Sequence, residues 1–171
     1  ANGSVAVNEG EIELNSGSIG IYGINYFDGA TNSATLGYGT DKINIENQKD
    51  IKTVSGGVTG DAFGIYANNT LTLADSSVNL TSASNIDLKG TGKVIGAYLK
   101  KTNLTSAGTI TVESTTGGTS VGIYSVESTA ATPITGSINV SGGLGGVGLF
   151  LNDSSMVNNA AITVDNVTSG A

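Results

Sequence analysis

Four residue types are absent from the 171-residue chain: it has no Cys, His, Trp or Arg, and its seven positive charges are all Lys. The absence of Cys excludes a disulfide framework and a thiolate metal site. The absence of His removes the usual general base and the commonest metal ligand. Without Arg, no bidentate clamp for phosphate or carboxylate is available. We therefore expect no cofactor, no metal centre and no catalytic residues.

Charged residues make up only 12% of the chain, and the net charge is −7. This acidic balance makes nucleic acid a poor partner and opposes binding to an anionic membrane surface. No run of about 18 apolar residues is present, so no helix is expected to span a membrane. The first residues lack the basic start and apolar run of a signal peptide. We expect any targeting segments to lie outside this sequence.

A short sequence motif, apolar–Gly–apolar–aromatic, occurs five times and is here called the aromatic word. Its glycines stand at positions 20, 64, 96, 122 and 148, so successive copies are 44, 32, 26 and 26 residues apart. The long first interval predicts a degenerate copy at Leu36-Gly37-Tyr38. Repeats of about 20–50 residues indicate solenoids, propellers or arrays. The five copies are Ile19-Gly20-Ile21-Tyr22, Phe63-Gly64-Ile65-Tyr66, Ile95-Gly96-Ala97-Tyr98, Val121-Gly122-Ile123-Tyr124 and Val147-Gly148-Leu149-Phe150.

A second repeated motif, small–x–Ile–x–aliphatic, accompanies the first and is here called the second word. Lys42-Ile43-Asn44-Ile45 is a looser copy of it, and Leu71-Thr72-Leu73 is a third, weaker apolar pair. The copies are Gly10-Glu11-Ile12-Glu13-Leu14, Ser84-Asn85-Ile86-Asp87-Leu88, Gly108-Thr109-Ile110-Thr111-Val112, Gly136-Ser137-Ile138-Asn139-Val140 and Ala160-Ala161-Ile162-Thr163-Val164.

Both words alternate apolar residues with polar or small ones, which is the period of a β-strand. Turn-forming residues fill the gaps between words, and no segment has a helical period. The pattern predicts an all-β parallel β-solenoid of about seven rungs, each of roughly 24–26 residues with three short strands. We expect the Ile and Val of each word to point inward. A β-sandwich or a transmembrane barrel is the alternative, but neither explains a word that recurs every 26 residues.

Five aromatic residues share one slot of the repeated word, which predicts an aromatic ladder on one face of the solenoid. Strict alternation places these rings opposite residues such as Ile65 and Ile123, on the same face as the word's glycine. The ladder is a candidate platform for sugar rings or a partner protein, or else a stack that braces the coil. Its members are Tyr22, Tyr66, Tyr98, Tyr124 and Phe150.

Two further candidates lie near the N-terminus. Tyr26 and Phe27 precede a predicted Asp28-Gly29 turn and are a candidate loop contact. Glu9, Glu11 and Glu13 alternate on one strand, where three carboxylates either hold Ca²⁺ or form a solvated acidic face. No calcium-loop pattern follows them, which favours the solvated face.

These repeats resemble the passenger domains of large fusobacterial-type autotransporter (type V secretion) adhesins. The five aromatic words and the strands Gly108–Val112 and Gly136–Val140 carry the resemblance, which is densest from Phe63 to Val164. The range 23–60 departs from the pattern, so we expect irregular rungs or an insertion there.

The resemblance implies a right-handed parallel β-helix on the bacterial cell surface, attached to the outer membrane by a C-terminal barrel that this sequence does not contain. Residues 1–171 are then a single β-helix segment, an internal fragment that contacts flanking rungs of a longer passenger. The resemblance assigns no catalytic residue to any position.

The resemblance also implies a role in cell adhesion and virulence. We expect a non-catalytic, rod-like segment that displays binding faces for a protein or glycan on host cells or other bacteria. A purely structural stalk or filament segment with no binding face is the alternative. A polysaccharide-degrading enzyme is a third hypothesis, but its chemistry needs acids clustered with Arg, Lys or His on one wall. The 14 carboxylates of this chain are scattered along the sequence.

Overall fold

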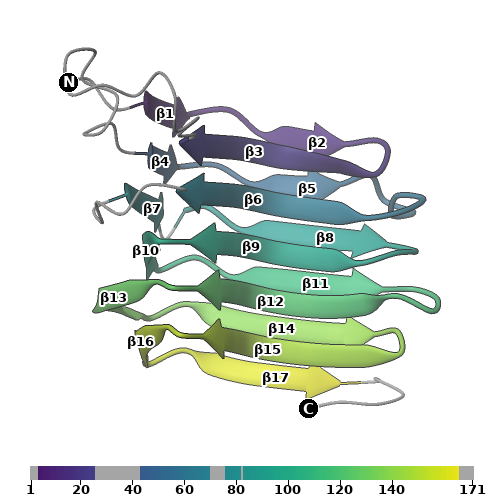
Figure 1. Ribbon diagram of the computed structural model, residues 1–171. Coiled ribbons are helices and arrows are strands. Elements are labelled where there is room, and N and C mark those ends of the chain that lie inside the picture. Colours follow the sequence, from purple (N-terminus) through teal and green to yellow (C-terminus); the bar gives the residue numbers. More distant parts are fainter. Residues whose placement is uncertain (1–3, 26–42, 70–75, 82, 166–171) are drawn as a thin grey trace, which may run out of the picture.

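The structure is a computed structural model that describes residues 4–25, 43–69, 76–81 and 83–165. Within these ranges every regular element is a β-strand, and none of the described residues forms a helix that is long and apolar enough to cross a membrane. The strands are stacked in parallel layers, with β1 to β3 at one end of the stack and β17 at the other (Figure 1). The predicted all-β class is confirmed.

The strands belong to four parallel sheets, here named A to D. Sheet A contains β1 (Ser4–Asn8), β4 (Ile43–Asn47), β7 (Ser76–Leu80) and β10 (Thr102–Ser106). Sheet B contains β2 (Ile12–Leu14), β5 (Ile51–Thr53), β8 (Ile86–Gly90), β11 (Ile110–Ser114), β14 (Ser137–Gly142) and β17 (Ala161–Asp165). Sheet C contains β3 (Ser18–Asn25), β6 (Ala62–Asn69), β9 (Val94–Lys100), β12 (Thr119–Val126) and β15 (Gly145–Asn152). Sheet D contains β13 (Thr129–Ile134) and β16 (Ser155–Asn158).

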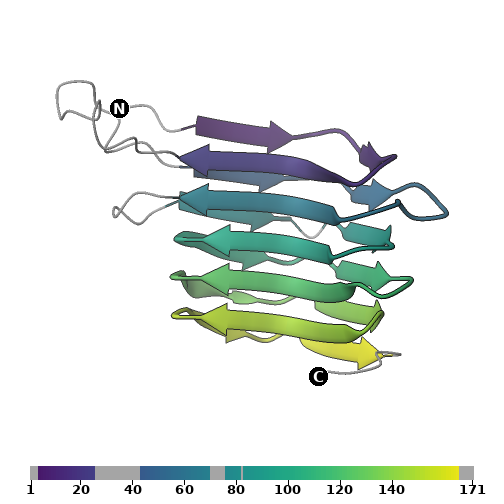
Figure 2. The ribbon, with the colours of Figure 1, turned by 45° about the vertical axis from the view of Figure 1, so that its right-hand side comes forward.

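The chain visits the sheets in a fixed cycle, from A or D to B and then to C, before it returns one layer further along the stack. Every described strand pair is parallel. Figure 2 shows the strands of sheet C lying one above another with their arrows in the same direction. This arrangement is consistent with a parallel β-solenoid and excludes a sandwich, whose sheets are antiparallel.

The two repeated words occupy two different sheets. Copies of the aromatic word pair in register in sheet C, where Tyr66 lies opposite Tyr98. Copies of the second word pair in sheet B, where Ile86 lies opposite Ile110. The looser copy at 42–45 is an exception, because Ile43 and Ile45 belong to β4 of sheet A. Ile51 of β5 fills the corresponding place in sheet B.

The described part of the long interval between the first two aromatic words does not contain another strand of sheet C. β3 pairs directly with β6, with Ile21 opposite Ile65, and the degenerate copy predicted at Leu36-Gly37-Tyr38 lies outside the described residues. Within the range 23–60, β4 and β5 pair in register with β1 and β2. Residues 26–42, which include Tyr26 and Phe27, lie outside the described residues, as do Leu71 to Leu73.

The core lies between sheets A, B and C and consists of columns of aliphatic side chains. The inward slot of sheet B is isoleucine in all six strands, and the matching slot of sheet C holds isoleucine in three strands, alanine in one and leucine in one. Each such column removes apolar surface from water at every layer, at roughly 25 cal/mol per Å². The fully buried members are Ile51, Ile86, Ile110 and Ile138 from sheet B, Ile65, Ala97 and Ile123 from sheet C, and Val78 and Leu104 from sheet A.

The glycine of the aromatic word points into this core, which corrects the prediction that it shares a face with the aromatic ring. A Cβ added to Gly64 would lie 2.7 Å from Cγ2 of Ile86 and 2.6 Å from the carbonyl oxygen of Gly96. The same approach joins Gly20 to Ile51, Gly96 to Ile110, Gly122 to Ile138 and Gly148 to Ile162. The backbone of the word is therefore bent at this residue, and alternation shifts by one position, as at a β-bulge.

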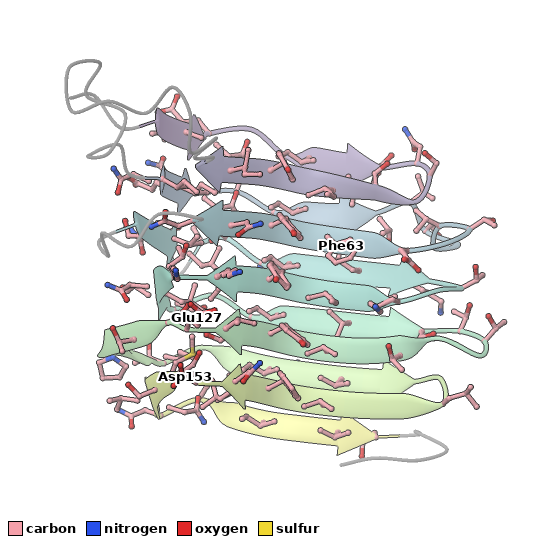
Figure 3. All side chains as sticks on the ribbon, in the orientation of Figure 1. Phe63, Glu127 and Asp153 are labelled. Atoms are coloured by element: carbon pink, nitrogen blue, oxygen red, sulfur yellow. The ribbon has the colours of Figure 1, made fainter. Side chains whose placement is uncertain are left out.

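The chain turns again at the end of each of the strands β9, β12 and β15, and no glycine occupies this corner. Lys101, Glu127 and Asp153 follow these strands with φ of 47°, 49° and 48°, in the left-handed region. Figure 3 labels Glu127 and Asp153 at this corner. The amides of Lys101 and Glu127 donate to carbonyls of the next layer, at 3.0 and 2.9 Å. The hydroxyl of Ser128 accepts from the Thr102 amide at 3.1 Å and donates to the Val126 carbonyl at 2.9 Å.

We expect Gly64→Ala to destabilise the fold by about 1–3 kcal/mol, because the new methyl group must displace Ile86 or the Gly96 backbone. Chemical denaturation of the purified chain measures this loss. Gly117→Ala is the matched control, because its Cβ would meet only Cδ1 of Leu144, at 3.8 Å. The control should change stability by less than about 1 kcal/mol. Equal losses in the two variants would contradict the role given to the contact with Ile86.

Candidate functional site

The predicted aromatic ladder is present on the outer face of sheet C. Its five rings are in register, one from each strand of the sheet. Neighbouring ring centroids are 5.3, 4.5, 5.4 and 4.5 Å apart, and the planes differ by only 16°, 7°, 17° and 20°. The spacing follows the distance of about 4.8 Å between paired strands. In order along the stack, the rings are those of Tyr22, Tyr66, Tyr98, Tyr124 and Phe150.

Stacking occupies the faces of the three inner rings, because each lies between two neighbouring rings. Only the edges and hydroxyl groups of Tyr66, Tyr98 and Tyr124 remain for a partner, and these side chains are half-buried. The end rings are more open: Tyr22 is 55% exposed and Phe150 is 38% exposed. A sugar ring that stacks face-on therefore has no access to the middle of the ladder.

A row of apolar side chains runs beside the ladder on the same outer face. The ring of Phe63 meets Tyr66 edge to face, with centroids 6.1 Å apart, and Figure 3 labels it on sheet C. The first residue of the word thus points outward, which corrects the expectation that every Ile and Val of the word is inward. The shift of alternation at the glycine causes this. The apolar row consists of Ile19, Phe63, Ile95, Val121 and Val147.

Between the ladder and the apolar row lies a groove of about 330 Å³. Ile95 is only 4% exposed although it lies outside the main core, so its neighbours on this face bury it. The face therefore carries a small apolar layer of its own. The groove is lined by Phe63, Ile95 and Val121 from the row, Tyr66, Tyr98 and Tyr124 from the ladder, and Lys93 and Thr119 at the rim.

Two lysines flank this surface. Lys93 precedes β9 and lines the groove, and Lys100 ends the same strand on the outward side. Within the part of the chain that the structure describes, neither ammonium group forms an ion pair, whereas Lys52, Lys89 and Lys101 each pair with a glutamate at 2.9, 2.9 and 3.3 Å. The Asp61 carboxylate near Lys93 accepts a hydrogen bond from the Lys93 amide at 2.7 Å.

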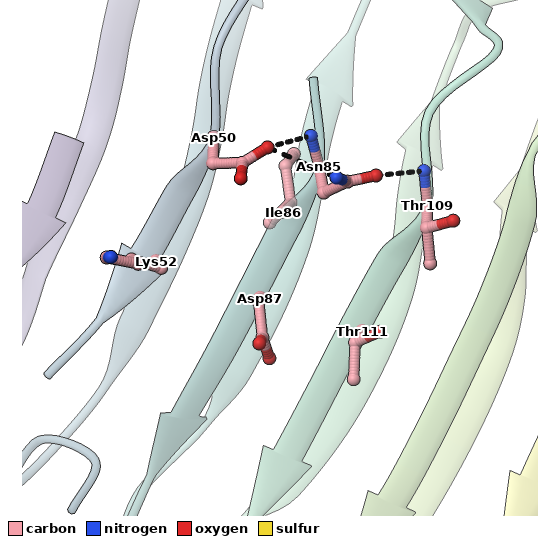
Figure 4. A pocket seen from close by; sticks show the side chains of 7 residues that line it. All are labelled: Asp50, Lys52, Asn85, Ile86, Asp87, Thr109 and Thr111. Atoms are coloured by element: carbon pink, nitrogen blue, oxygen red, sulfur yellow. Dashed lines mark hydrogen bonds between the residues drawn. The ribbon is translucent and has the colours of Figure 1, made fainter. Parts of the chain in front are cut away.

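Sheet B carries a different surface, with a polar pocket of about 340 Å³ on its outer side (Figure 4). Asp50 accepts hydrogen bonds from the amide and the side chain of Asn85, at 2.8 and 3.2 Å. The side-chain Oδ1 of Asn85 accepts a hydrogen bond from the Thr109 amide at 3.1 Å. These hydrogen bonds link the residues that immediately precede strands β5, β8 and β11. Asp50 and Asp87 line the same pocket, but Asp87 is exposed and Asp50 is half-buried, so neither is enclosed as a general acid needs to be.

The acidic residues near the N-terminus form an ion pair with sheet B. Glu11 contacts Lys52 at 2.9 Å, and this hydrogen bond raises the pKa of Lys52 above its usual 10.5. In the described ranges no three carboxylates gather into a group that could hold a metal ion. Glu13 lies in β2, whereas Glu9 and Glu11 lie between β1 and β2, so the prediction that the three alternate on one strand is wrong; all three side chains are exposed.

Comparison with protein-family models, with curated proteins and with solved structures finds no match to this chain.

Sequence reasoning found the ladder but missed the groove and the flanking lysines. The groove depends on the outward turn of the word's first residue, and the sequence signal for it is the glycine that follows. Phe63 at that first position is a further signal, because a ring of this size is hard to place in a core that is filled by Ile, Val, Leu and Ala. The candidate contact at Tyr26 and Phe27 lies outside the described residues.

Tyr98→Leu should lower the free energy of unfolding by about 1–3 kcal/mol, because it removes two stacked pairs that contribute roughly 0.5–1.5 kcal/mol each. Phe150→Leu is the control, since Phe150 stacks on one described ring, and we expect about half the loss. Denaturant titration measures both variants. If the two cost the same, the inner rings do not brace the stack.

Burial raises the pKa of Tyr98 above its usual 10.0, and the neighbouring Tyr66 and Tyr124 raise it further. Because the folded-state pKa is the higher one, the contribution of Tyr98 to stability is full below about pH 10 and is lost as the pH rises through the folded-state value. We expect a late tyrosinate absorbance component above about pH 10 that Tyr98→Phe lacks. Identical titration curves for the two proteins would contradict this.

Proposed function

We propose that the chain is a non-catalytic segment of a bacterial surface adhesin of the autotransporter type, folded as a right-handed parallel β-helix. In this proposal the stacked layers form a rod that spaces and displays binding surfaces toward host cells or other bacteria. The aromatic ladder, the apolar row and the groove between them, together called the ladder face, are the surface that contacts the partner.

The observation that carries the proposal is the partial exposure of an apolar surface on a regular parallel stack. The core is filled by sheets A, B and C, yet sheet C repeats aromatic and aliphatic residues on its outer side as well. A stack needs only one buried face per sheet for its core, so a second apolar layer is available for association. Contiguous apolar grooves of this kind are typical of protein-interaction surfaces.

Two alternatives predict different behaviour. A purely structural stalk uses the ladder only to brace neighbouring layers, which the close ring stacking also supports. A polysaccharide-degrading enzyme has its chemistry at the polar pocket of sheet B, where Asp50 and Asp87 lie near one another. The openness of that pocket to solvent and the hydrogen bonds that occupy Asp50 make it the weaker candidate.

The proposal is tested by measuring how the purified, folded chain binds to epithelial cells and to other bacteria by flow cytometry. We expect binding that falls roughly tenfold or more in Tyr66→Leu with Tyr124→Leu, because truncation of central interface aromatics removes most of the binding energy. Thr111→Ala with Asn139→Ala, on the outer side of sheet B, is the matched control and should bind as the unchanged chain does.

The result is interpreted only for variants whose circular dichroism retains the β signal. Binding that is absent in the unchanged chain supports the stalk instead. Release of reducing sugar from polysaccharide by the unchanged chain, lost in Asp87→Asn, would support the enzyme.

A further inference from the structure

Beside its apolar groove, the ladder face presents ring edges, phenolic hydroxyl groups and two lysines. An aromatic ring is negative on its faces and positive at its edge, and stacking hides the faces of Tyr66, Tyr98 and Tyr124. Their phenolic hydroxyl groups are available as donors. Lys93 and Lys100 add two ammonium groups at the two ends of strand β9. The two ammonium groups favour a partner that supplies negative charge, whereas the hydroxyl groups can both donate and accept hydrogen bonds.

The groove sets a second requirement, which is apolar bulk. Its floor at Ile95 is almost fully buried, and Phe63 and Val121 form its wall opposite the ladder. A ligand gains affinity here by placing apolar side chains into the groove, because their burial removes apolar surface from water. Sugars offer mainly hydroxyl groups, and the ring faces on which their apolar sides stack in other proteins are closed in this ladder.

Sheet B shows the contrasting charge pattern. Asp87 and Glu113 project from its outer side, and its lysines Lys52 and Lys89 are already paired with glutamates. Near the ladder face, Asp61 accepts a hydrogen bond from the Lys93 amide and Glu127 pairs with Lys101, and in the described residues neither carboxylate forms an ion pair with the ammonium groups of Lys93 or Lys100. Two ammonium groups without an ion pair offset part of the repulsion that a chain of net charge −7 exerts on an acidic ligand.

We propose that the ladder face binds an acidic, apolar polypeptide segment of a partner protein. Apolar side chains of the segment enter the groove over Ile95, and its carboxylates meet Lys93 and Lys100. This inference rests on the proposed adhesive function and specifies the chemistry of its partner.

Short synthetic peptides test this proposal against the ¹⁵N-labelled chain by NMR titration. One peptide alternates glutamate with leucine and phenylalanine; a second has lysine in place of every glutamate; a third has serine in place of every apolar residue. We expect only the first to shift amide signals of β6, β9 and β12 in a saturable manner. Oligogalacturonate, an acidic oligosaccharide, is the fourth probe and represents the glycan alternative.

Charge reversal tests whether Lys93 and Lys100 themselves, and not the net charge of the chain, attract the peptide. Lys93→Glu with Lys100→Glu should weaken binding of the acidic apolar peptide by about tenfold or more, since two attractive pairs become repulsive. Lys49→Glu is the control, because Lys49 is exposed outside sheet C, and its removal should change affinity less than about twofold. Val121→Thr, which makes the groove wall polar, should weaken binding severalfold, whereas Val126→Thr on the same strand but outside the groove should not.

The outcomes distinguish this inference from the proposed function. If the chain binds cells but the acidic apolar peptide does not shift the ladder face, the peptide partner is overturned and the adhesive function stands. Preferential binding of oligogalacturonate, or equal binding of the acidic and basic peptides, also overturns it. If the chain binds no cells, the proposed function fails, while saturable, lysine-dependent peptide binding would still support the site itself.

Discussion

The contact between a glycine of sheet C and an isoleucine of sheet B is the constraint on which the rest of this structure depends. At each layer the γ-methyl of the isoleucine occupies the space that a Cβ would take, as between Gly64 and Ile86. The two repeated words of the sequence are thus the two halves of one contact, which explains why they occur together. Because the contact sets how closely the sheets approach, it also fixes the register of the layers and the bend that turns the next side chains outward.

That bend determines what the outside of sheet C presents. Without it, Phe63 and Ile95 would point inward and the rings would stand alone; with it, two rows share the face and bury part of one another. The faces of the inner rings stack on one another, so they brace the ladder and are not accessible to a partner. The surface left to a partner consists of edges, hydroxyl groups, a narrow apolar groove and two lysines.

Much of this arrangement follows from the sequence, because repetition converts a weak local signal into a strong one. The strand period, the parallel stack and the in-register rings at Tyr66, Tyr98 and Tyr124 were all predicted from words that recur along the chain. Three features did not follow. Strict alternation misplaced the glycine and the first apolar residue, since a bend is a tertiary effect. The looser copy at 42–45 lies in sheet A, although the other copies of the second word lie in sheet B. Ile51 takes the corresponding place in sheet B, but its polar sequence neighbours show no sign of the motif. The corner at Lys101 and Glu127 has a repeated charged-then-hydroxyl signal, which is visible only once the layers are aligned.

The unequal intervals between words have a consequence for how such a chain tolerates change. The longer spacings of 44 and 32 residues are both taken up after a strand of sheet C, between β3 and β4 and between β6 and β7, whereas β9 and β10 are separated by a single residue. The pairing of Ile21 with Ile65 and of Ile65 with Ala97 is the same in kind as that of the evenly spaced layers. One corner of the molecule therefore accepts added sequence without disturbing the stack. Sequence can be acquired or lost at this corner while the pairing of the layers is kept.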